Sequence, residues 1–212
     1  MTPVVSIIGH SGSGKTTYIE KLITELKSRD YKVATIKHAQ EVTFDDTGRD
    51  SWRHIQAGSE TTIVSSPEKI VLVKPLTSDV NLDEVVRLLG DDYDIIITEG
   101  FKQGAAPKIE VHRKETGQLL DDIKNLIAIA TDESIKTDVK KFKITDVKGV
   151  ADLIEEKFII PNRERLSFYV NNKPVTLSNY PRDIITRILI AIASSLKGVG
   201  DINSINISLK KK

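Results

Sequence analysis

Short runs of apolar, mostly β-branched residues alternate along the chain with stretches in which apolar residues recur every three or four positions. In the first such stretch, Ile19, Leu22, Ile23 and Leu26 have the spacing of one buried helix face. Residues 82–89, closed by Gly90, predict another helix. This alternation over about the first 160 residues predicts an α/β fold, a three-layer α/β/α domain with a mostly parallel sheet. Strands are predicted at 4–8, 33–37, 94–98, 109–112 and 126–130, with shorter runs at 61–64 and 70–73.

The pattern changes near Pro161. Residues 166–170 and 175–177 predict a β-hairpin whose turn is the polar stretch 171–174. A helical stripe follows, and 202–209 alternates isoleucine with polar residues, as a half-buried strand does. We therefore expect a main domain over residues 1–160 and a small ββαβ extension over 161–212, which docks on the main domain or mediates self-association. The helical stripe consists of Ile184, Ile185, Ile188, Leu189 and Ile192.

The segment GHSGSGKT at residues 9–16 fits the pattern G-x-x-x-x-G-K-[ST] and lies between a predicted strand and a predicted helix. In such a loop, successive backbone N–H groups converge on an anion, and the helix N-terminus adds partial positive charge. Lys15 would reach the β- and γ-phosphates, and the Thr16 hydroxyl would bind Mg²⁺. The sequence therefore predicts a P-loop NTPase-type domain that binds a nucleoside triphosphate. The predicted phosphate-binding residues are Gly9, His10, Ser11, Gly12, Ser13, Gly14, Lys15, Thr16 and Thr17.

Asp94 opens one predicted strand and Glu99 closes it. Ligands of parallel α/β sheets bind beyond the carboxyl ends of the strands, so Glu99 lies at the phosphate end and Asp94 at the far end. A carboxylate there holds Mg²⁺ directly or through water. Glu99 is thus a predicted metal ligand and, with Lys15, a candidate catalytic residue; the alternative is a turn or capping role. Lys102 and Lys108 are candidate contacts for a polyanionic ligand, or solvated lysines.

The long polar loop after the second predicted strand lies at the same sheet edge. Its carboxylates could complete the magnesium shell, and its arginines could meet an anionic ligand. Charged loops are also commonly just solvated, and Asp50-Ser51 equally fits an ordinary helix N-cap. The candidates are Asp45 or Asp46 for the metal, and Arg49, Asp50 and Arg53 for the ligand.

Asp132 follows the strand predicted at 126–130. A carboxylate there could accept the N1–H and amino protons of guanine, a pairing that adenine does not offer; the alternative is a simple turn. The usual guanine signature Asn-Lys-x-Asp is absent from the sequence. The residues alone therefore leave GTP and ATP open.

Composition narrows the classes of function. The 212 residues contain 31 Lys and Arg against 30 Asp and Glu, a formal net charge of +1, so no basic field points to nucleic acid or a membrane surface. Cysteine is absent, and the 4 histidines form no cluster with metal-ligand spacing. The N-terminus does not fit a signal peptide, and the apolar stretch 188–193 is far short of a membrane span. We expect a soluble, cytoplasmic protein.

GHSGSGKTT, Ile36-Lys37-His38, residues 48–53 with Ala57-Gly58, and TEGFK followed by residues 107–111 occur in this order. Together they resemble the molybdopterin-guanine dinucleotide biosynthesis adaptor family, MobB, over about residues 3–133. The resemblance implies a dimeric, P-loop GTP-binding protein that assists the molybdopterin guanylyltransferase and that could contact molybdopterin. It carries residues 9–17 to phosphate binding, Glu99 to the acidic strand end, and Asp50, Ser51 and Arg53 to a functional loop.

The leading interpretation is a GTP-binding adaptor with slow GTPase activity, because no residue stands out as a strong base to activate water. A small-molecule kinase is a second interpretation, with Arg163 and Arg165 as its lid arginines. A metallochaperone-type GTPase that delivers nickel is a third, and the scarcity of His and Cys argues against it. The last is a nucleotide-binding scaffold without turnover.

Overall fold

The computed structural model describes residues 2–39, 48–76, 80–163, 166–171 and 173–209. The chain divides into two compact units, Thr2–Arg163 and a smaller unit of residues 164–212. The larger unit contains the main sheet, and the smaller unit contains a short hairpin and one long helix.

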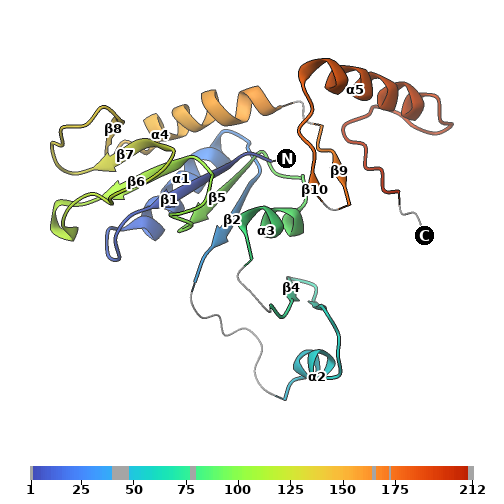
Figure 1. Ribbon diagram of the computed structural model, residues 1–212, viewed down its shortest axis with the longest axis horizontal. Coiled ribbons are helices and arrows are strands. Elements are labelled where there is room, and N and C mark those ends of the chain that lie inside the picture. Colours follow the sequence, from blue (N-terminus) through green and yellow to red (C-terminus); the bar gives the residue numbers. More distant parts are fainter. Residues whose placement is uncertain (1, 40–47, 77–79, 164–165, 172, 210–212) are drawn as a thin grey trace. The chain divides into compact units, whose positions relative to one another are not determined.

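A six-stranded sheet with the order β2-β5-β1-β6-β7-β8 forms the centre of the larger unit (Figure 1). Every neighbouring pair of strands is parallel, which confirms the predicted α/β fold of the P-loop NTPase type. β1 lies between β5 and β6, so the loop after β1 opens at the middle of the carboxyl edge. The strands are β1 Val4–Ile8, β2 Val33–Lys37, β5 Ile95–Glu99, β6 Lys108–His112, β7 Leu126–Thr131 and β8 Lys140–Lys143.

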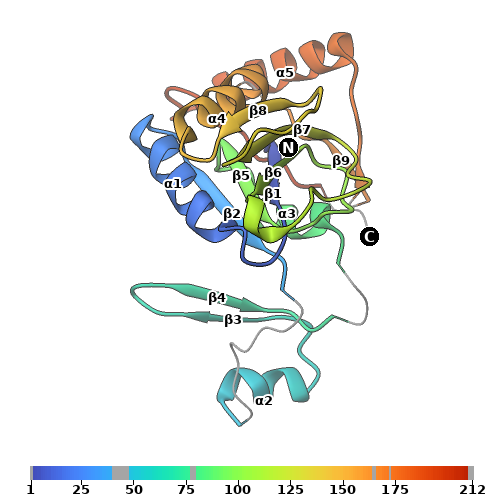
Figure 2. The same ribbon diagram turned by 90° about the vertical axis from the view of Figure 1, so that its left-hand side faces the viewer.

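Helices α1 and α4 cover one face of the sheet, and α3 lies on the other (Figure 2). Alternate strand residues such as Val5 and Ile97 are fully buried against Leu22 and Leu26 of α1. The predicted helix at 82–89 is α3, whose first turn is capped by the Asn81 side chain. The helices are α1 Lys15–Ser28, α3 Leu82–Leu89 and α4 Val147–Ile154, with a π-helical turn at Glu155–Ile159 and 3₁₀ turns at Lys114–Thr116 and Ile160–Asn162.

The face of the sheet opposite α1 carries buried polar side chains. Lys108 has no exposed surface, and its ammonium donates to three main-chain carbonyl oxygens at 2.5, 2.9 and 3.0 Å. The predicted contact of Lys108 with a polyanionic ligand is therefore wrong. The ammonium instead ties two loops together over the sheet, because a buried cation needs such compensation. The carbonyls belong to Gly104, Ala106 and Lys124, and the other buried polar residues of this face are Ser6, Thr98, Glu110, His112 and Thr131.

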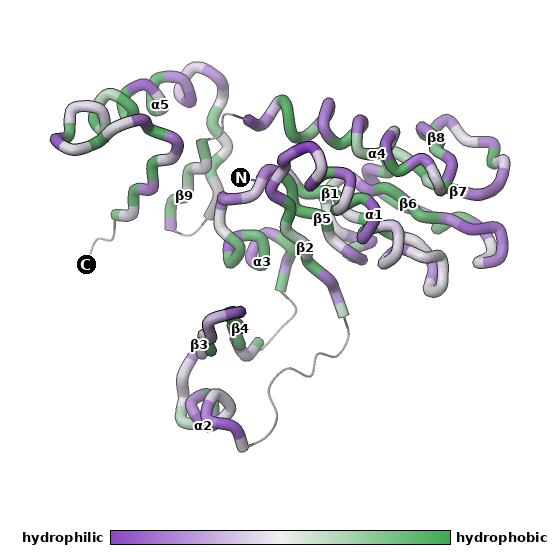
Figure 3. The backbone as a smooth tube through the Cα atoms, turned by 180° about the vertical axis from the view of Figure 1, so that it is seen from behind, coloured by the Kyte–Doolittle hydropathy of each residue, from purple (hydrophilic) through white to green (hydrophobic). Residues whose placement is uncertain are grey.

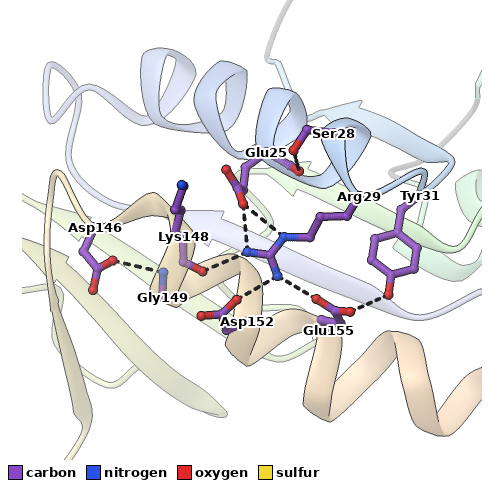
Figure 4. Close-up of polar contacts among 9 residues, drawn as sticks. All are labelled: Glu25, Ser28, Arg29, Tyr31, Asp146, Lys148, Gly149, Asp152 and Glu155. Atoms are coloured by element: carbon purple, nitrogen blue, oxygen red, sulfur yellow. Dashed lines mark hydrogen bonds and ion pairs between the residues drawn. The ribbon is translucent and has the colours of Figure 1, made fainter.

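An ionic network centred on Arg29 joins the end of α1 to α4 and the π-helical turn (Figure 4). The Arg29 guanidinium is 2.8 Å from Glu25, 2.7 Å from Asp152 and 2.6 Å from Glu155. The Tyr31 hydroxyl donates to the second oxygen of Glu155 at 2.7 Å. Only 21% of the Arg29 side chain is exposed, so the network is screened less than an ordinary surface pair.

Helix α2, Asp50–Gln56, packs against an antiparallel hairpin of β3, Thr62–Ser65, and β4, Ile70–Val73. The two short runs predicted from the sequence are these strands, and they pair with each other as a separate two-stranded sheet. Apolar side chains of the hairpin are exposed, among them Ile63 at 59% and Ile70 at 71%.

The smaller unit contains β9 Tyr169–Val170, β10 Lys173–Pro174 and α5 Asn179–Ser194. The second strand of the hairpin begins earlier than predicted, at Lys173, which pairs with Val170, and Asn171 takes the positive φ of 51° that suits a tight turn. α5 confirms the predicted helix, but its stripe is exposed at Ile184, Ile188 and Ile192. Figure 3 shows the hydrophobic residues along α5.

The strand predicted at 202–209 is not a strand in the structure. Within the described residues of this unit the sheet is the short pair β9–β10, and an extended segment needs a neighbouring strand to pair with. Among the helices that the structure describes, none has the length and apolar character of a membrane span.

Candidate functional site

The glycine-rich loop follows β1 at the centre of the carboxyl edge, and its backbone requires glycine. Gly12 and Gly14 have φ angles of 79° and 83°, in the region that side chains disfavour. At Gly9 a Cβ atom would clash with the carbonyl oxygen of Val111 on β6 and the Ser13 hydroxyl. The loop is therefore packed tightly onto β6, and the sequence pattern reflects a real steric limit.

α1 begins at Lys15, with Gly14 as an N-cap that offers no side-chain hydrogen bond, and its first turn carries no acidic residue. The N–H groups of such an end are available to an anion. Ser11, Thr16 and Thr17 are exposed, so a ligand can reach the loop. The Lys15 ammonium folds back over the loop and donates to the carbonyl oxygen of His10 at 2.6 Å. Burial lowers the pKa of Lys15, and the nearby Glu99 partly opposes this shift.

Glu99 ends β5, in register with Ile7 of β1, and its carboxylate faces the start of α1. The Thr16 hydroxyl lies 3.3 Å from both of its oxygens, and the Lys37 ammonium lies 3.6 Å from one of them. A hydroxyl and a carboxylate side by side are hard oxygen ligands, which fit Mg²⁺ with several waters. Asp94 lies at the opposite end of the strand, where it accepts the Lys32 N–H at 2.8 Å.

The other predicted metal ligand, Asp46, and its alternative, Asp45, lie outside the described residues. Within the described ranges, no group of three or more His, Cys, Asp or Glu side chains could hold a metal ion. The structure places Asp50 and Arg53 on α2, where their charged groups are 3.6 Å apart and exposed. Their predicted roles as ligand-binding residues stay predictions.

Asp132 follows β7 at the same edge, where a base-binding residue was predicted. One carboxylate oxygen accepts the Lys114 N–H at 3.0 Å, and the other lies 3.5 Å from the Arg113 guanidinium. Arg113 was missed by sequence reasoning, and it also donates through Nε to the carbonyl oxygen of Ser13 at 3.3 Å. Its position directly after the strand of residues 109–112, at the carboxyl edge, was the signal that could have found it.

A family model described as "Molybdopterin guanine dinucleotide synthesis protein B" matches residues 4–132, from β1 to the end of β7. This chain belongs to the MobB family. The match covers more than half of the chain and includes the glycine-rich loop, Glu99, Arg113 and Asp132.

Similar proteins with curated names support the same family assignment. A molybdopterin-guanine dinucleotide biosynthesis adapter protein of Haemophilus influenzae is 37% identical over 156 residues, which are 72% of this chain and 88% of the relative. The Escherichia coli protein of the same name is 32% identical over 163 residues, 74% of this chain and 93% of the relative.

Solved MobB structures share the fold. The crystal structure of a molybdopterin-guanine biosynthesis protein B has a TM-score of 0.58 and 28% identity, covering 72% of this chain and 98% of that protein. The crystal structure of Bacillus subtilis MobB has a TM-score of 0.56 and 26% identity, covering 74% and 98%. About a quarter of this chain therefore lies outside each of these matches.

Proposed function

We propose that this protein is a GTP-binding adaptor in molybdopterin guanine dinucleotide biosynthesis. It binds Mg²⁺ and GTP at the glycine-rich loop and assists the molybdopterin guanylyltransferase. The observation that carries the nucleotide part is the Thr16–Glu99 pair, 3.3 Å apart, beside a helix start without a side-chain cap. The names of the relatives carry the pathway.

In this proposal Lys15 leaves the His10 carbonyl and neutralises the β- and γ-phosphates, while Thr16 and Glu99 hold Mg²⁺. The metal offsets phosphate charge when it is bound. We assign Glu99 to the metal, because both of its oxygens face the Thr16 hydroxyl. We therefore expect slow hydrolysis, which a partner would accelerate.

We also propose that Asp132 reads the guanine base and that the protein is a homodimer. The hairpin β3–β4 supports the second point, since it exposes Ile63 and Ile70 on short strands that pair only with each other among the described residues. Such apolar surface favours association. Light scattering tests this: Ile70→Asp is expected to shift a dimer towards the monomer, and an unchanged mass contradicts pairing through the hairpin.

Calorimetric titration with GTP and ATP, each with Mg²⁺, tests the nucleotide assignment. GTP is expected to bind more tightly than ATP, and Lys15→Ala to weaken GTP binding by about 1.5–3 kcal/mol, the range for hydrogen bonds to charged groups. If the wild type and the Lys15→Ala variant bind GTP with equal affinity, the assignment of the glycine-rich loop to phosphate binding is contradicted. Product analysis that found a phosphorylated small molecule would favour a kinase instead.

Co-elution with the molybdopterin guanylyltransferase, with and without GTP, tests the adaptor part, and added molybdopterin tests whether it joins the complex. A complex that strengthens with GTP is expected. The Lys15→Ala protein is the matched control, because its complex should no longer respond to GTP. Failure to associate in either condition contradicts the adaptor role.

A further inference from the structure

This inference rests on the proposed function. The orientation of a bound nucleotide then follows from the strands that flank β1, which are β5 on one side and β6 on the other. Thr16 and Glu99 place the magnesium ion, and with it the γ-phosphate, on the side of β5. The nucleoside then extends to the other side of β1, over the ends of β6 and β7. The residues that leave these two strands therefore face the sugar and base.

Arg113 leaves β6 at this point and connects three parts of the edge. Its Nε donates to the Ser13 carbonyl oxygen of the glycine-rich loop at 3.3 Å. Its NH1 lies 3.5 Å from Asp132, which is itself fixed by the Lys114 N–H at 3.0 Å. The side chain remains 37% exposed, so the guanidinium is held in place and still open to a ligand.

The Arg113 guanidinium also lies next to Gly14. A Cβ atom there would lie 3.4 Å from Nε and 3.6 Å from NH2 of Arg113, so the guanidinium rests against the glycine. A second link joins the ends of the same two strands, because the buried His112 ring nitrogen lies 2.6 Å from a Glu133 carboxylate oxygen. Arg113 is therefore oriented before any ligand arrives, which reduces the ordering cost of binding.

We propose that Arg113 is a nucleoside-binding residue. Its guanidinium plane supports the purine base, while Asp132 and the Ser13 carbonyl oxygen hold the edge of the guanidinium. A guanidinium stacks on aromatic rings through its face and keeps its N–H groups for hydrogen bonds in the plane. The same side chain touches the loop that grips the phosphates, so base and phosphates meet one connected surface.

Titrations of the full-length chain with Mg²⁺ and either GTP or tripolyphosphate test this. Tripolyphosphate has no nucleoside and reports on the loop alone. Arg113→Ala is expected to weaken GTP binding about tenfold and to leave tripolyphosphate affinity within about twofold. Arg113→Lys should behave like Arg113→Ala, because an ammonium has no plane to stack. Lys136→Ala, an exposed lysine after β7 outside the proposed contacts, is the matched control and should change neither affinity.

Three results overturn the inference. Equal losses for GTP and tripolyphosphate mean that Arg113 acts on the phosphates or the loop. Unchanged GTP affinity in Arg113→Ala means that it does not contact the nucleotide, while the proposed function stands. Failure of the wild-type chain to bind either ligand overturns the proposed function as well. Thermal unfolding of each variant excludes a simple loss of fold.

Discussion

Glu99 illustrates how neighbours decide the role of one side chain. It lies beside Lys37 and the Thr16 hydroxyl at the carboxyl end of β5. Asp94, at the other end of the same strand, accepts a backbone N–H of Lys32 instead. Two similar acids on one strand thus differ because only one faces the glycine-rich loop.

The pair gives a matched test of magnesium binding. Glu99→Gln is expected to weaken GTP binding in the presence of Mg²⁺ by about 1–3 kcal/mol, because the charged metal ligand is lost. The difference should vanish when EDTA removes the metal. Asp94→Asn serves as the control and should leave both titrations unchanged, since an amide oxygen can still accept the Lys32 N–H. A Glu99→Gln effect that persists in EDTA contradicts the metal role.

Glu110 gives a prediction for pH dependence. It is fully buried on β6, where burial raises the pKa of its carboxyl, and the Leu120 N–H and the nearby His112 oppose this only in part. One of its oxygens has no hydrogen-bond partner. Because the pKa is raised in the folded state, protonated Glu110 contributes to the free energy of unfolding. This contribution is fully present below the ordinary pKa of about 4.3 and is lost as pH rises through the folded-state pKa.

Glu110→Gln removes the carboxylate and keeps an oxygen for the Leu120 N–H. The variant is therefore expected to unfold at a higher temperature than the wild type at pH 7, and the gain should shrink towards pH 4. Glu115→Gln, an exposed acid in the following loop, is the control and should show no such trend. A gain that does not change with pH contradicts this account of Glu110.

Sequence reasoning at the residue scale worked where a motif fixes geometry. The glycine-rich loop and Glu99 lie together as expected, because a strand, a loop and a helix in that order leave little choice. Lys108 was misread because no local pattern reveals that carbonyl oxygens of the preceding loop and of Lys124, 16 residues further along the chain, converge on its ammonium. Arg113 was missed for the same reason, since its partners come from other elements.

At the scale of elements, the Arg29 network joins α1 to α4 through residues far apart in the sequence. Removing Arg29 would leave Glu25, Asp152 and Glu155 close together without their cation. Such acids then repel one another, and α4 loses an anchor on α1.

Arg29→Ala is therefore expected to lower the free energy of unfolding by about 1.5–3 kcal/mol, the range for hydrogen bonds to charged groups. Lys27→Ala, an exposed lysine at the same end of α1, is the control and should change stability by less than about 0.5 kcal/mol. Denaturant unfolding measures both. Equal effects of the two substitutions contradict a specific role for the network.

The apolar pattern predicted the central strands and the edge strand β2, but not the other edge strand, β8. β8 contains three lysines in four residues, and only Phe142 is buried, so it lacks the apolar run that marks β5 or β7. Lysine on an edge strand discourages pairing with other chains. The stretch 202–209 is the opposite case, a predicted strand that does not form. Its alternation suits a strand, but strand pairing depends on a neighbour that the sequence pattern does not specify.

At the scale of the molecule, the residues that match the family model lie in the larger unit. The family model ends at residue 132, and roughly three quarters of this chain cover 93% of the Escherichia coli relative and 98% of the solved structure with a TM-score of 0.58. All residues of the proposed nucleotide site that the structure describes belong to the larger unit.

A chain that ends at Arg163 is therefore expected to fold and to bind GTP with Mg²⁺ within about twofold of the full-length affinity, because the sheet and its core are intact. Calorimetry and thermal unfolding of the shortened protein measure this. A loss of GTP binding with the fold retained contradicts the independence of the larger unit and assigns part of the nucleotide site to the smaller one.

The strand order has a consequence for biosynthesis. β1 emerges first from the ribosome, but its partners β5 and β6 are encoded some ninety residues or more downstream, as the pairing of Val4 with Ile96 shows. Non-local parallel pairing closes late and slowly. The floor of the glycine-rich loop includes the Val111 carbonyl, so a nascent chain shorter than this point has no completed anion cradle. Under the proposed function, nucleotide binding would accordingly be a late event of translation and would report that the central strands have assembled.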